Sequence, residues 1–165
     1  MRNRLAGLVL LAAMAGAVPA EAQGVRFGVG IVPVISLEDE GGSDFGIGGQ
    51  VDFLPTGNPD GHWGARVDGA YIFNEFSNYL LWNGDVAYHF TTASPSIHPF
   101  LLGGAALRHG GDIDAQFGIG AGAGTNIHLS GSPVGLYVDA RFQRFFDPGF
   151  SQLQLGGGVR FGQGE

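Results

Sequence analysis

The stretch FGIGAGAGTNIHL, residues 117–129, carries a glycine at every second position for four repeats. Glycine-rich loops that cradle phosphates follow G-x-G-x-x-G or G-x-x-x-x-G-K-[ST], at a turn between a strand and a helix. Gly118, Gly120, Gly122 and Gly124 match neither spacing. Successive side chains of a strand point to opposite faces, so this period predicts a strand with glycine on one face only.

A nucleophile with an adjacent base is suggested only by His128 and Ser130. Such a pair needs a carboxylate that orients the histidine, and Ser130 begins a glycine and proline turn. The five histidines lack H-E-x-x-H or any other close metal-binding spacing. The acidic groups at 38–40 and at Asp112 and Asp114 lack the ordered ligand spacing of a calcium loop. We therefore expect no catalytic residue, no metal and no cofactor.

The N-terminus has the three parts of a secretory signal peptide. Arg2 and Arg4 precede an apolar run over residues 5–18, and Ala20 and Ala22 supply the small residues of a cleavage site. A transmembrane helix is the alternative, but the run of about 14 residues falls short of the roughly 20 that a bilayer requires. We expect cleavage after Ala22.

The 165 residues divide into this signal peptide, 1–22, and a single exported domain, 23–165. Removing Arg2, Arg4 and Glu21 from the eight basic and fifteen acidic residues leaves six arginines and fourteen acids, a net charge of −8. No nucleic-acid partner is expected, because phosphate binding needs a basic patch. Cysteine is absent, and 31 glycines occur together with 12% aromatic residues, which favours strands and tight turns over disorder.

From Val25 onward, apolar residues alternate with small or polar ones in segments separated by clusters of Gly, Pro, Asn, Asp and Ser. This period of two predicts an all-β meander of antiparallel strands joined by hairpins. We expect eight strands, over Val25 to Val34, Asp44 to Leu54, Trp63 to Phe73, Tyr79 to Phe90, Pro99 to Arg108, Gln116 to His128, Leu136 to Phe146, and Gln152 to Phe161.

The two faces of these strands differ in kind: one is apolar almost throughout, and the other is small and polar. A soluble lipocalin-like barrel would place the apolar face inside and show glycine and alanine to water. A transmembrane barrel places the apolar face against lipid, and its lumenal acids and arginines can pair across a narrow interior. We favour the second arrangement, with the fifth strand, PFLLGGAALR, undecided between the faces. The expected lumenal polar network comprises Arg26, Asp52, Arg66, Asp68, Asp85, Asp139, Arg141 and Arg160.

In such a barrel the alternating glycines of the sixth strand would all face the lumen. Glycine suits places where another group approaches the backbone closely or where a barrel wall bends. We expect these glycines to make room in the lumen for long residues from other strands, with Arg66, Arg141 and Gln143 as candidates.

The aromatic residues form two girdles if the mature N-terminus lies in the periplasm, as amphipathic rings at two membrane interfaces would. Arg108 and Arg144 are expected on the outer face near the extracellular rim, where they would bind lipopolysaccharide headgroups. The periplasmic girdle would contain Phe27, Phe53, Trp63, Phe90, Phe100 and Phe161, and the other Phe45, Phe73, Trp82, Phe117 and Phe146.

The signal peptide, the eight amphipathic strands, the segment GLYVDARFQRFF and the closing LQLGGGVRF resemble the small outer-membrane β-barrel proteins of the OmpA/OmpX kind. This resemblance implies an eight-stranded antiparallel up-and-down transmembrane β-barrel in the cell outer membrane. It also implies that the barrel-assembly machinery reads an aromatic residue near the end of the last strand, a role that Phe161 fits. Here four residues follow, Gly162 to Glu165.

The expected function is a structural or envelope-interaction role without catalysis, with outer-membrane lipid and lipopolysaccharide as partners. Three alternatives stay open. A soluble periplasmic barrel could bind an apolar ligand, and a barrel with space beside its glycines could be a narrow channel for small solutes. His128 and Ser130 superficially resemble the His-x-Ser pair of outer-membrane lipid A deacylases, so the third alternative is a lipid-modifying enzyme.

Overall fold

The computed structural model describes residues 24–38, 42–54, 62–94, 96–111, 113–132, 134–147 and 149–161. The expected signal peptide, with Ala20 and Ala22, lies outside the described residues. No helix in the described part of the chain is long and apolar enough to cross a membrane.

Eight strands follow one another along the chain, each ending within three residues of its expected bounds. The largest extensions are in the fifth and sixth strands, which pair closely up to their hairpin, with a register irregularity between Arg108 and Gly110. The strands are β1 (Val25–Ser36), β2 (Ser43–Phe53), β3 (His62–Phe73), β4 (Tyr79–His89), β5 (Ile97–Gly110), β6 (Ile113–His128), β7 (Val134–Phe145) and β8 (Ser151–Phe161).

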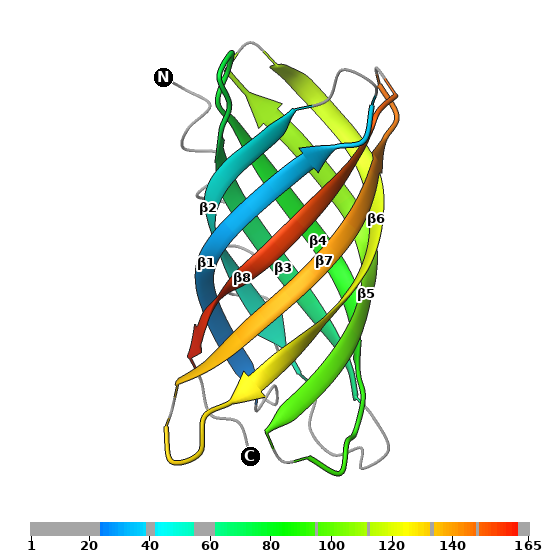
Figure 1. Ribbon diagram of the computed structural model, residues 1–165. Coiled ribbons are helices and arrows are strands. Elements are labelled where there is room, and N and C mark those ends of the chain that lie inside the picture. Colours follow the sequence, from blue (N-terminus) through cyan, green and yellow to red (C-terminus); the bar gives the residue numbers. More distant parts are fainter. Residues whose placement is uncertain are drawn as a thin grey trace.

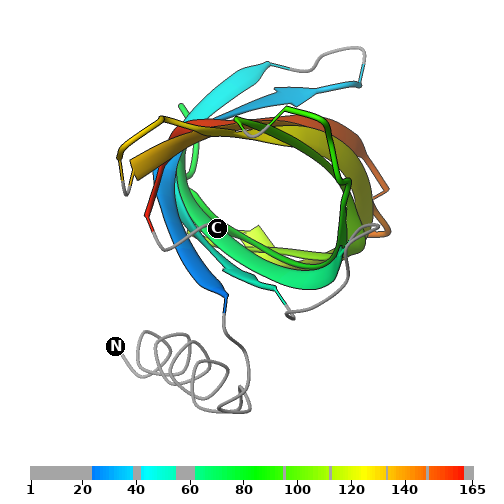
Figure 2. The same cartoon turned by 90° about the horizontal axis from the view of Figure 1, so that it is seen from below.

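The strands form one closed antiparallel barrel in which every strand pairs with its neighbour in sequence and β8 pairs with β1 (Figures 1 and 2). Following the register once around the barrel from Arg26 leads to Ser36, ten residues further along β1. A stagger of this size accompanies a strand tilt of about 35–45°. Closure leaves no strand edge, so each strand finds its backbone partners within the sheet.

The two ends of the barrel are distinct. At the end that is lower in Figure 1, β1 begins and β8 ends, and we call it the terminal end. At the opposite end, which we call the loop end, lie the connections from β1 to β2, β3 to β4, β5 to β6 and β7 to β8.

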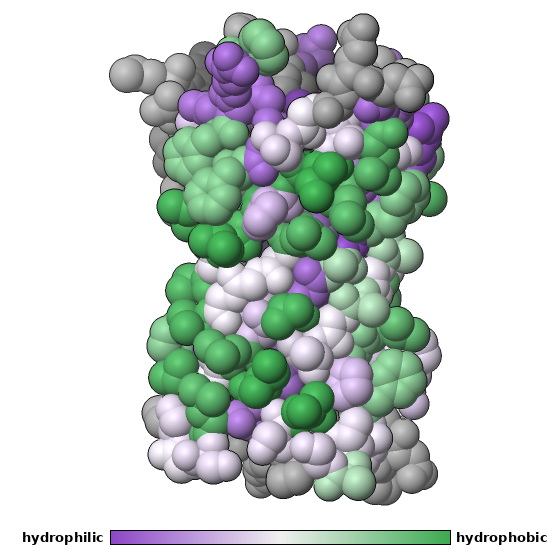
Figure 3. Space-filling view, viewed as in Figure 1, coloured by the Kyte–Doolittle hydropathy of each residue, from purple (hydrophilic) through white to green (hydrophobic). Residues whose placement is uncertain are grey.

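The outer wall carries the apolar face, as expected for a barrel in lipid. Trp63 is 62% exposed, and Phe27, Ile47 and Phe117 are similarly open on the outside. Green apolar side chains spread over the wall in Figure 3, and purple ones gather at the upper rim. Among the described outward-facing strand residues none is acidic, and the basic ones are His109 and Arg144 near the loop end. Exposure of so large an apolar surface is unfavourable in water and favourable in lipid.

The fifth strand points Phe100 and Leu102 into the lumen and Leu101 outward. The expected place of Phe100 in the periplasmic girdle is therefore wrong, since this ring is only 1% exposed inside the barrel. Both faces of β5 are apolar, so alternation alone could not decide its parity. Pairing with β6 decides it, because Phe100 lies opposite Gly124, where a side chain would collide with the ring.

The outward-facing aromatic residues gather at both ends of the outer wall. At the terminal end, Tyr88 makes edge contacts with Trp63 and Phe90, with ring centroids 5.0 Å apart in each pair. At the loop end, Tyr71 contacts Phe73 with centroids 5.2 Å apart. Rings in these positions suit the two interfaces of a membrane.

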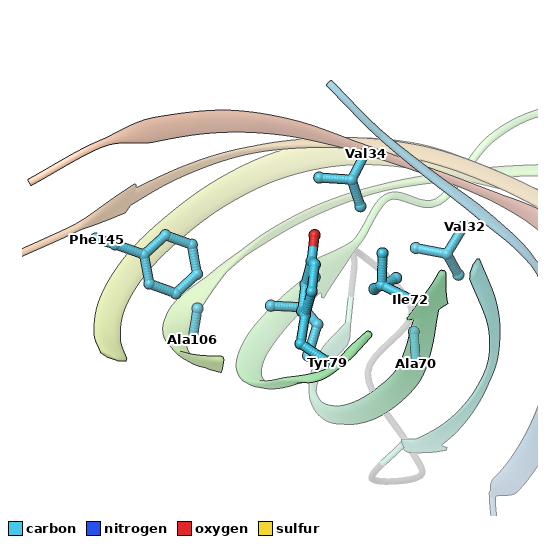
Figure 4. Close-up of a cluster of buried hydrophobic side chains, with 8 residues drawn as sticks. Val32, Val34, Ala70, Ile72, Tyr79, Ala106 and Phe145 are labelled. Atoms are coloured by element: carbon cyan, nitrogen blue, oxygen red, sulfur yellow. The ribbon is translucent and has the colours of Figure 1, made fainter. Parts of the chain in front are cut away.

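An apolar cluster closes the lumen at the loop end (Figure 4). Phe150 packs against it and stacks on Phe145, with ring centroids 4.8 Å apart. This cluster fills the loop end of the lumen with closely packed side chains. Its buried members are Val32, Val34, Ala70, Ile72, Tyr79, Leu81, Ala106 and Phe145.

The glycines of β6 face the lumen, and large side chains occupy the space in front of them. A Cβ on Gly120 would lie 3.2 Å from Cγ of Gln143 and 3.4 Å from Cδ of Arg141. A Cβ on Gly122 would lie 3.1 Å from Cβ of Arg141. Arg141 and Gln143 thus use this space as expected. Arg66 does not reach the glycines directly.

Replacing Gly122 with leucine should prevent folding, because the new side chain would enter the space that Arg141 occupies. Gly84→Leu is the matched control, since Gly84 faces outward with no atom within 4 Å of an added Cβ. Unboiled SDS gels will show whether each variant forms a compact, heat-modifiable barrel. A heat-modifiable Gly122→Leu barrel would contradict the packing described for β6.

Candidate functional site: the lumenal charge network

The interior of the barrel holds acids and arginines from four strands at its middle. Asp52 on β2, Arg66 and Asp68 on β3, and Asp85 on β4 face inward together with residues of β7. They do so because each occupies the inward position of the two-residue alternation. Asp139 and Arg141 on β7 complete this set of six, and Arg160 joins it through a longer contact with Asp52, so ion pairs link seven of the eight expected network residues.

Arg66 bridges β2 and β7. Its Nε donates to Oδ1 of Asp52 at 2.6 Å, and Nη2 donates to Oδ2 of the same carboxylate at 3.4 Å. Nη1 reaches Oδ2 of Asp139 across the lumen at 3.3 Å. The guanidinium also lies over the ring of Phe100, with Cζ 4.4 Å from the ring centroid. This stacking is how Arg66 is linked to the glycine strand, because Phe100 covers Gly124.

Arg141 makes the second bridge, from β7 to β3 and β4. Its Nη1 and Nη2 donate to the two carboxylate oxygens of Asp68 at 3.3 and 3.0 Å. Nη2 also lies 2.8 Å from Oδ2 of Asp85. Arg66 and Arg141 are each only 1% exposed, and charges this deeply buried are stable only when paired and hydrogen-bonded.

A chain of side-chain amides extends the network toward the loop end. Gln152 donates to Gln143 at 2.7 Å, Gln143 donates to Asn83 at 2.5 Å, and Asn83 donates to Asp68 at 2.7 Å. Sequence reasoning placed these amides on the polar face but did not assign them to the network. The sequence could have predicted their part in the network, because these amides occupy the same inward-facing strand positions as Asp68 and Arg141.

The space left within the middle of the lumen is small. A cavity of about 20 Å³ lies among Gln50, Asp68, Tyr137, Asp139 and Gln154, beside glycines of β2, β3 and β8. A volume of this size has room for about one water molecule. The arrangement therefore supports a packed interior and offers no wide path for solutes at this level.

Arg26 and Arg160 differ from the other network arginines. Nη2 of Arg160 lies 3.6 Å from Oδ2 of Asp52, which is already held by Arg66, and none of the guanidinium nitrogens of Arg160 has a hydrogen-bond partner. Nε of Arg26 is buried and also lacks a partner. The expected pairing of lumenal acids and arginines thus reaches Arg160 through one long contact, and no ion pair of Arg26 is found among the described residues.

The expected outward position of Arg108 is also wrong. Arg108 shares the inward parity of Phe100, and its guanidinium lies 3.9 Å from the ring centroid of Tyr79 and 5.2 Å from that of Phe150. The sequence around Arg108 could not predict its inward position, because β5 is apolar on both faces.

Arg144 does face outward near the loop end. Its Nη1 donates to Oγ of Ser151 at 3.0 Å and lies 3.6 Å from Oε1 of Glu38. The Arg144 side chain is 48% exposed, so this ion pair contributes little to stability. Phe161 is the last residue of β8 and is exposed on the outer wall opposite Phe27.

His128 and Ser130 do not form a nucleophile and base pair in the described structure. The ring of His128 faces the lumen and contacts the ring of His98, with centroids 5.2 Å apart. Ser130 lies in the turn after β6, and no hydrogen bond between described residues joins the His128 ring to Ser130 or to a carboxylate. The described residues contain no group of three or more His, Asp or Glu side chains that could hold a metal ion.

Replacing Arg66 with methionine should destabilise the barrel by about 3–5 kcal/mol, because Asp139 loses its ion pair and Asp52 keeps only the longer contact with Arg160. Arg144→Met removes a charge from the outer wall and should cost about 0–1 kcal/mol. Urea unfolding of both variants in detergent micelles, followed by tryptophan fluorescence, measures the difference. Equal losses in the two variants would contradict the buried network as a source of stability.

No protein-family model and no curated protein matches the sequence. The fold, however, matches solved structures. Neisserial surface protein A (NspA) superposes with a TM-score of 0.57 at 16% identity, covering 83% of this chain and 96% of that one. The N-terminal β-barrel domain of OprF from Pseudomonas aeruginosa gives 0.57 and 16%, covering 82% and 97%. The outer membrane enzyme PagL gives 0.52 and 16%, covering 81% and 99%.

Identities this low establish the architecture and leave the activity open. The matched proteins include an enzyme, so a shared fold does not separate a catalytic barrel from a non-catalytic one. The apolar outer wall, the two aromatic girdles and the charged interior are those of a barrel that spans an outer membrane. This chain therefore has the fold of the small eight-stranded outer-membrane β-barrels, which its sequence pattern resembles.

Proposed function

We propose that this protein serves a structural or envelope-interaction role in the outer membrane, without catalysis and without conducting solutes. The single observation that carries the proposal is the filled lumen. Ion pairs occupy its middle, and an apolar cluster closes its loop end. An eight-stranded barrel is just wide enough to be filled by its own side chains.

The absence of catalysis is proposed from the placement of the nucleophile candidates. A barrel enzyme acting on lipid would need its reactive groups on the outer wall or at a rim open to lipid. His128 faces the lumen at the terminal end, beside His98. The described residues offer no carboxylate that orients it, so the enzyme alternative has no assembled site in its support.

Two partners follow from residues on the outer wall. We propose that Phe161, exposed at the end of β8, is the aromatic residue that the barrel-assembly machinery reads. We also propose that Arg144 contacts lipopolysaccharide phosphates, because it faces outward near the loop end and half of its side chain is open. Arg108 no longer supports this second proposal, since it points inward.

Cell fractionation tests the location, and recordings in planar bilayers test the filled lumen. We expect the protein in the outer-membrane fraction as a heat-modifiable band, and the purified barrel should give no steady single-channel steps in planar bilayers. A soluble periplasmic protein would contradict the membrane assignment. Steady conductance steps would overturn the filled lumen while leaving the location intact.

Arg144→Ala should reduce the extra thermal stability that the barrel gains in lipopolysaccharide-containing bilayers over bilayers of neutral lipid. Arg108→Ala is the contrasting variant, because it removes an inward-facing arginine and should lower stability equally in both bilayers. The measurement is the midpoint of heat modification on gels. An unchanged lipid-dependent difference in Arg144→Ala rules out the proposed headgroup contact.

A further inference from the structure

Six polar side chains face the lumen at the terminal end of the barrel, below the ion pairs of Arg66 and Arg141. Each lies within three residues of the end of its strand, on β1, β4, β5, β6 or β8. The acid at this end is Asp52 on β2, whose two carboxylate oxygens are held by Arg66. We call this group the terminal ring, and it consists of Arg26, His89, His98, Asn126, His128 and Arg160.

The members of the terminal ring lie close to one another. His98 and Asn126 are register partners on adjacent strands, and the rings of His98 and His128 are in contact. Arg26 and Arg160 are near enough to His128, and also to His89, to act on both electrostatically. The ring thus surrounds one region of the lumen.

Two members of the ring are deeply buried and have polar atoms without partners. Asn126 is 1% exposed, and neither its amide nitrogen nor its amide oxygen makes a hydrogen bond. Arg160 is 5% exposed, and Nε, Nη1 and Nη2 all lack hydrogen-bond partners. Buried polar atoms in a folded protein are normally satisfied, so a cluster of unsatisfied donors indicates a missing acceptor.

The charges at this end are also unbalanced, with more positive than negative groups. Arg26, Arg66 and Arg160 all interact electrostatically with Asp52, and Arg66 occupies both oxygens of that carboxylate. Further along the lumen the balance reverses, since Arg141 faces both Asp68 and Asp85. The terminal ring therefore carries surplus positive charge, which favours the binding of an anion.

One position of the barrel wall beside the ring has no side chain. Gly135 lies between His128 and Arg160 in the hydrogen-bonded register, so the wall between these two side chains carries no side chain of its own. A Cβ on Gly135 would lie 2.8 Å from the carbonyl oxygen of Ile127, so this position accepts no side chain unless the backbone shifts.

We propose that the terminal ring is a binding site for a small oxyanion of the phosphate class. The guanidinium of Arg160 supplies forked donors for two oxygens, the amide of Asn126 supplies another donor, and Arg26 adds a second positive charge. The site is open at the terminal mouth of the barrel, and the ion pairs of Arg66 and Arg141 block its other side. Because the ring faces the lumen, the anion enters from the aqueous side, whereas lipid headgroups approach the outer wall.

The test uses the full-length mature barrel purified in a neutral, phosphate-free detergent. Sodium phosphate is titrated against sodium chloride at constant ionic strength, and binding is followed by isothermal titration calorimetry and by the thermal unfolding midpoint. We expect a saturable binding isotherm and a rise of the midpoint with phosphate alone, since a ligand that binds only the folded state stabilises it.

Two variants within the ring sharpen the test. Arg160→Gln should weaken phosphate binding at least tenfold, because it removes the charge and the forked donors. Asn126→Asp places a carboxylate inside the ring, so it should raise the unfolding midpoint without phosphate and abolish the response to phosphate. Arg144→Gln is the matched control on the outer wall and should bind phosphate as the unaltered protein does. Asn126→Asp keeps the test decisive if Arg160→Gln does not fold.

Three results would overturn the proposal. The first is an unfolding midpoint and a heat signal that respond equally to phosphate and chloride. The second is phosphate binding that persists in Asn126→Asp. The third is stabilisation that appears only in phospholipid micelles and is lost in Arg144→Gln, which would assign the effect to headgroups on the outer wall.

Discussion

The pairing of two buried arginines with four aspartates is the interaction on which the rest of this barrel depends. Arg66 and Arg141 connect β7 to β2, β3 and β4 across the lumen, at distances between 2.6 and 3.4 Å. Neither charge could remain in the interior without its partners. Backbone hydrogen bonds close the wall of the barrel, and these ion pairs determine which side chains fill its lumen.

Glycine on the neighbouring strand β6 is the steric counterpart of this pairing. Arg141 lies where the side chains of Gly120 and Gly122 would be, and Phe100 lies over Gly124 beneath the guanidinium of Arg66. A narrow barrel can hold long charged residues only if the facing positions are small. The same reasoning explains why the glycines recur at every second residue, since only the lumenal face needs to be empty.

The charge of the lumen changes along the barrel axis, from an excess of acid around Arg141 to an excess of base at the terminal end. Asp68 and Asp85 share Arg141, whereas Arg26 and Arg160 gather near the single carboxylate of Asp52. The loop end is closed by apolar side chains, and Arg108 is accommodated there by the rings of Tyr79 and Phe150. This gradient gives the two mouths of one barrel different chemistry, and a fold-level likeness to other barrels could not have revealed it.

The sequence by itself determined the strands, the antiparallel meander and the apolar outer face, because the two-residue period appears directly in the order of residues such as Phe27, Val29 and Ile31. It also placed the lumenal acids and arginines on one face. Tertiary structure alone decided the parity of β5, where both faces are apolar, and so the inward positions of Phe100 and Arg108. It alone decided which charges pair and which remain unpartnered, because these contacts join strands far apart in sequence and depend on the register of the closed barrel.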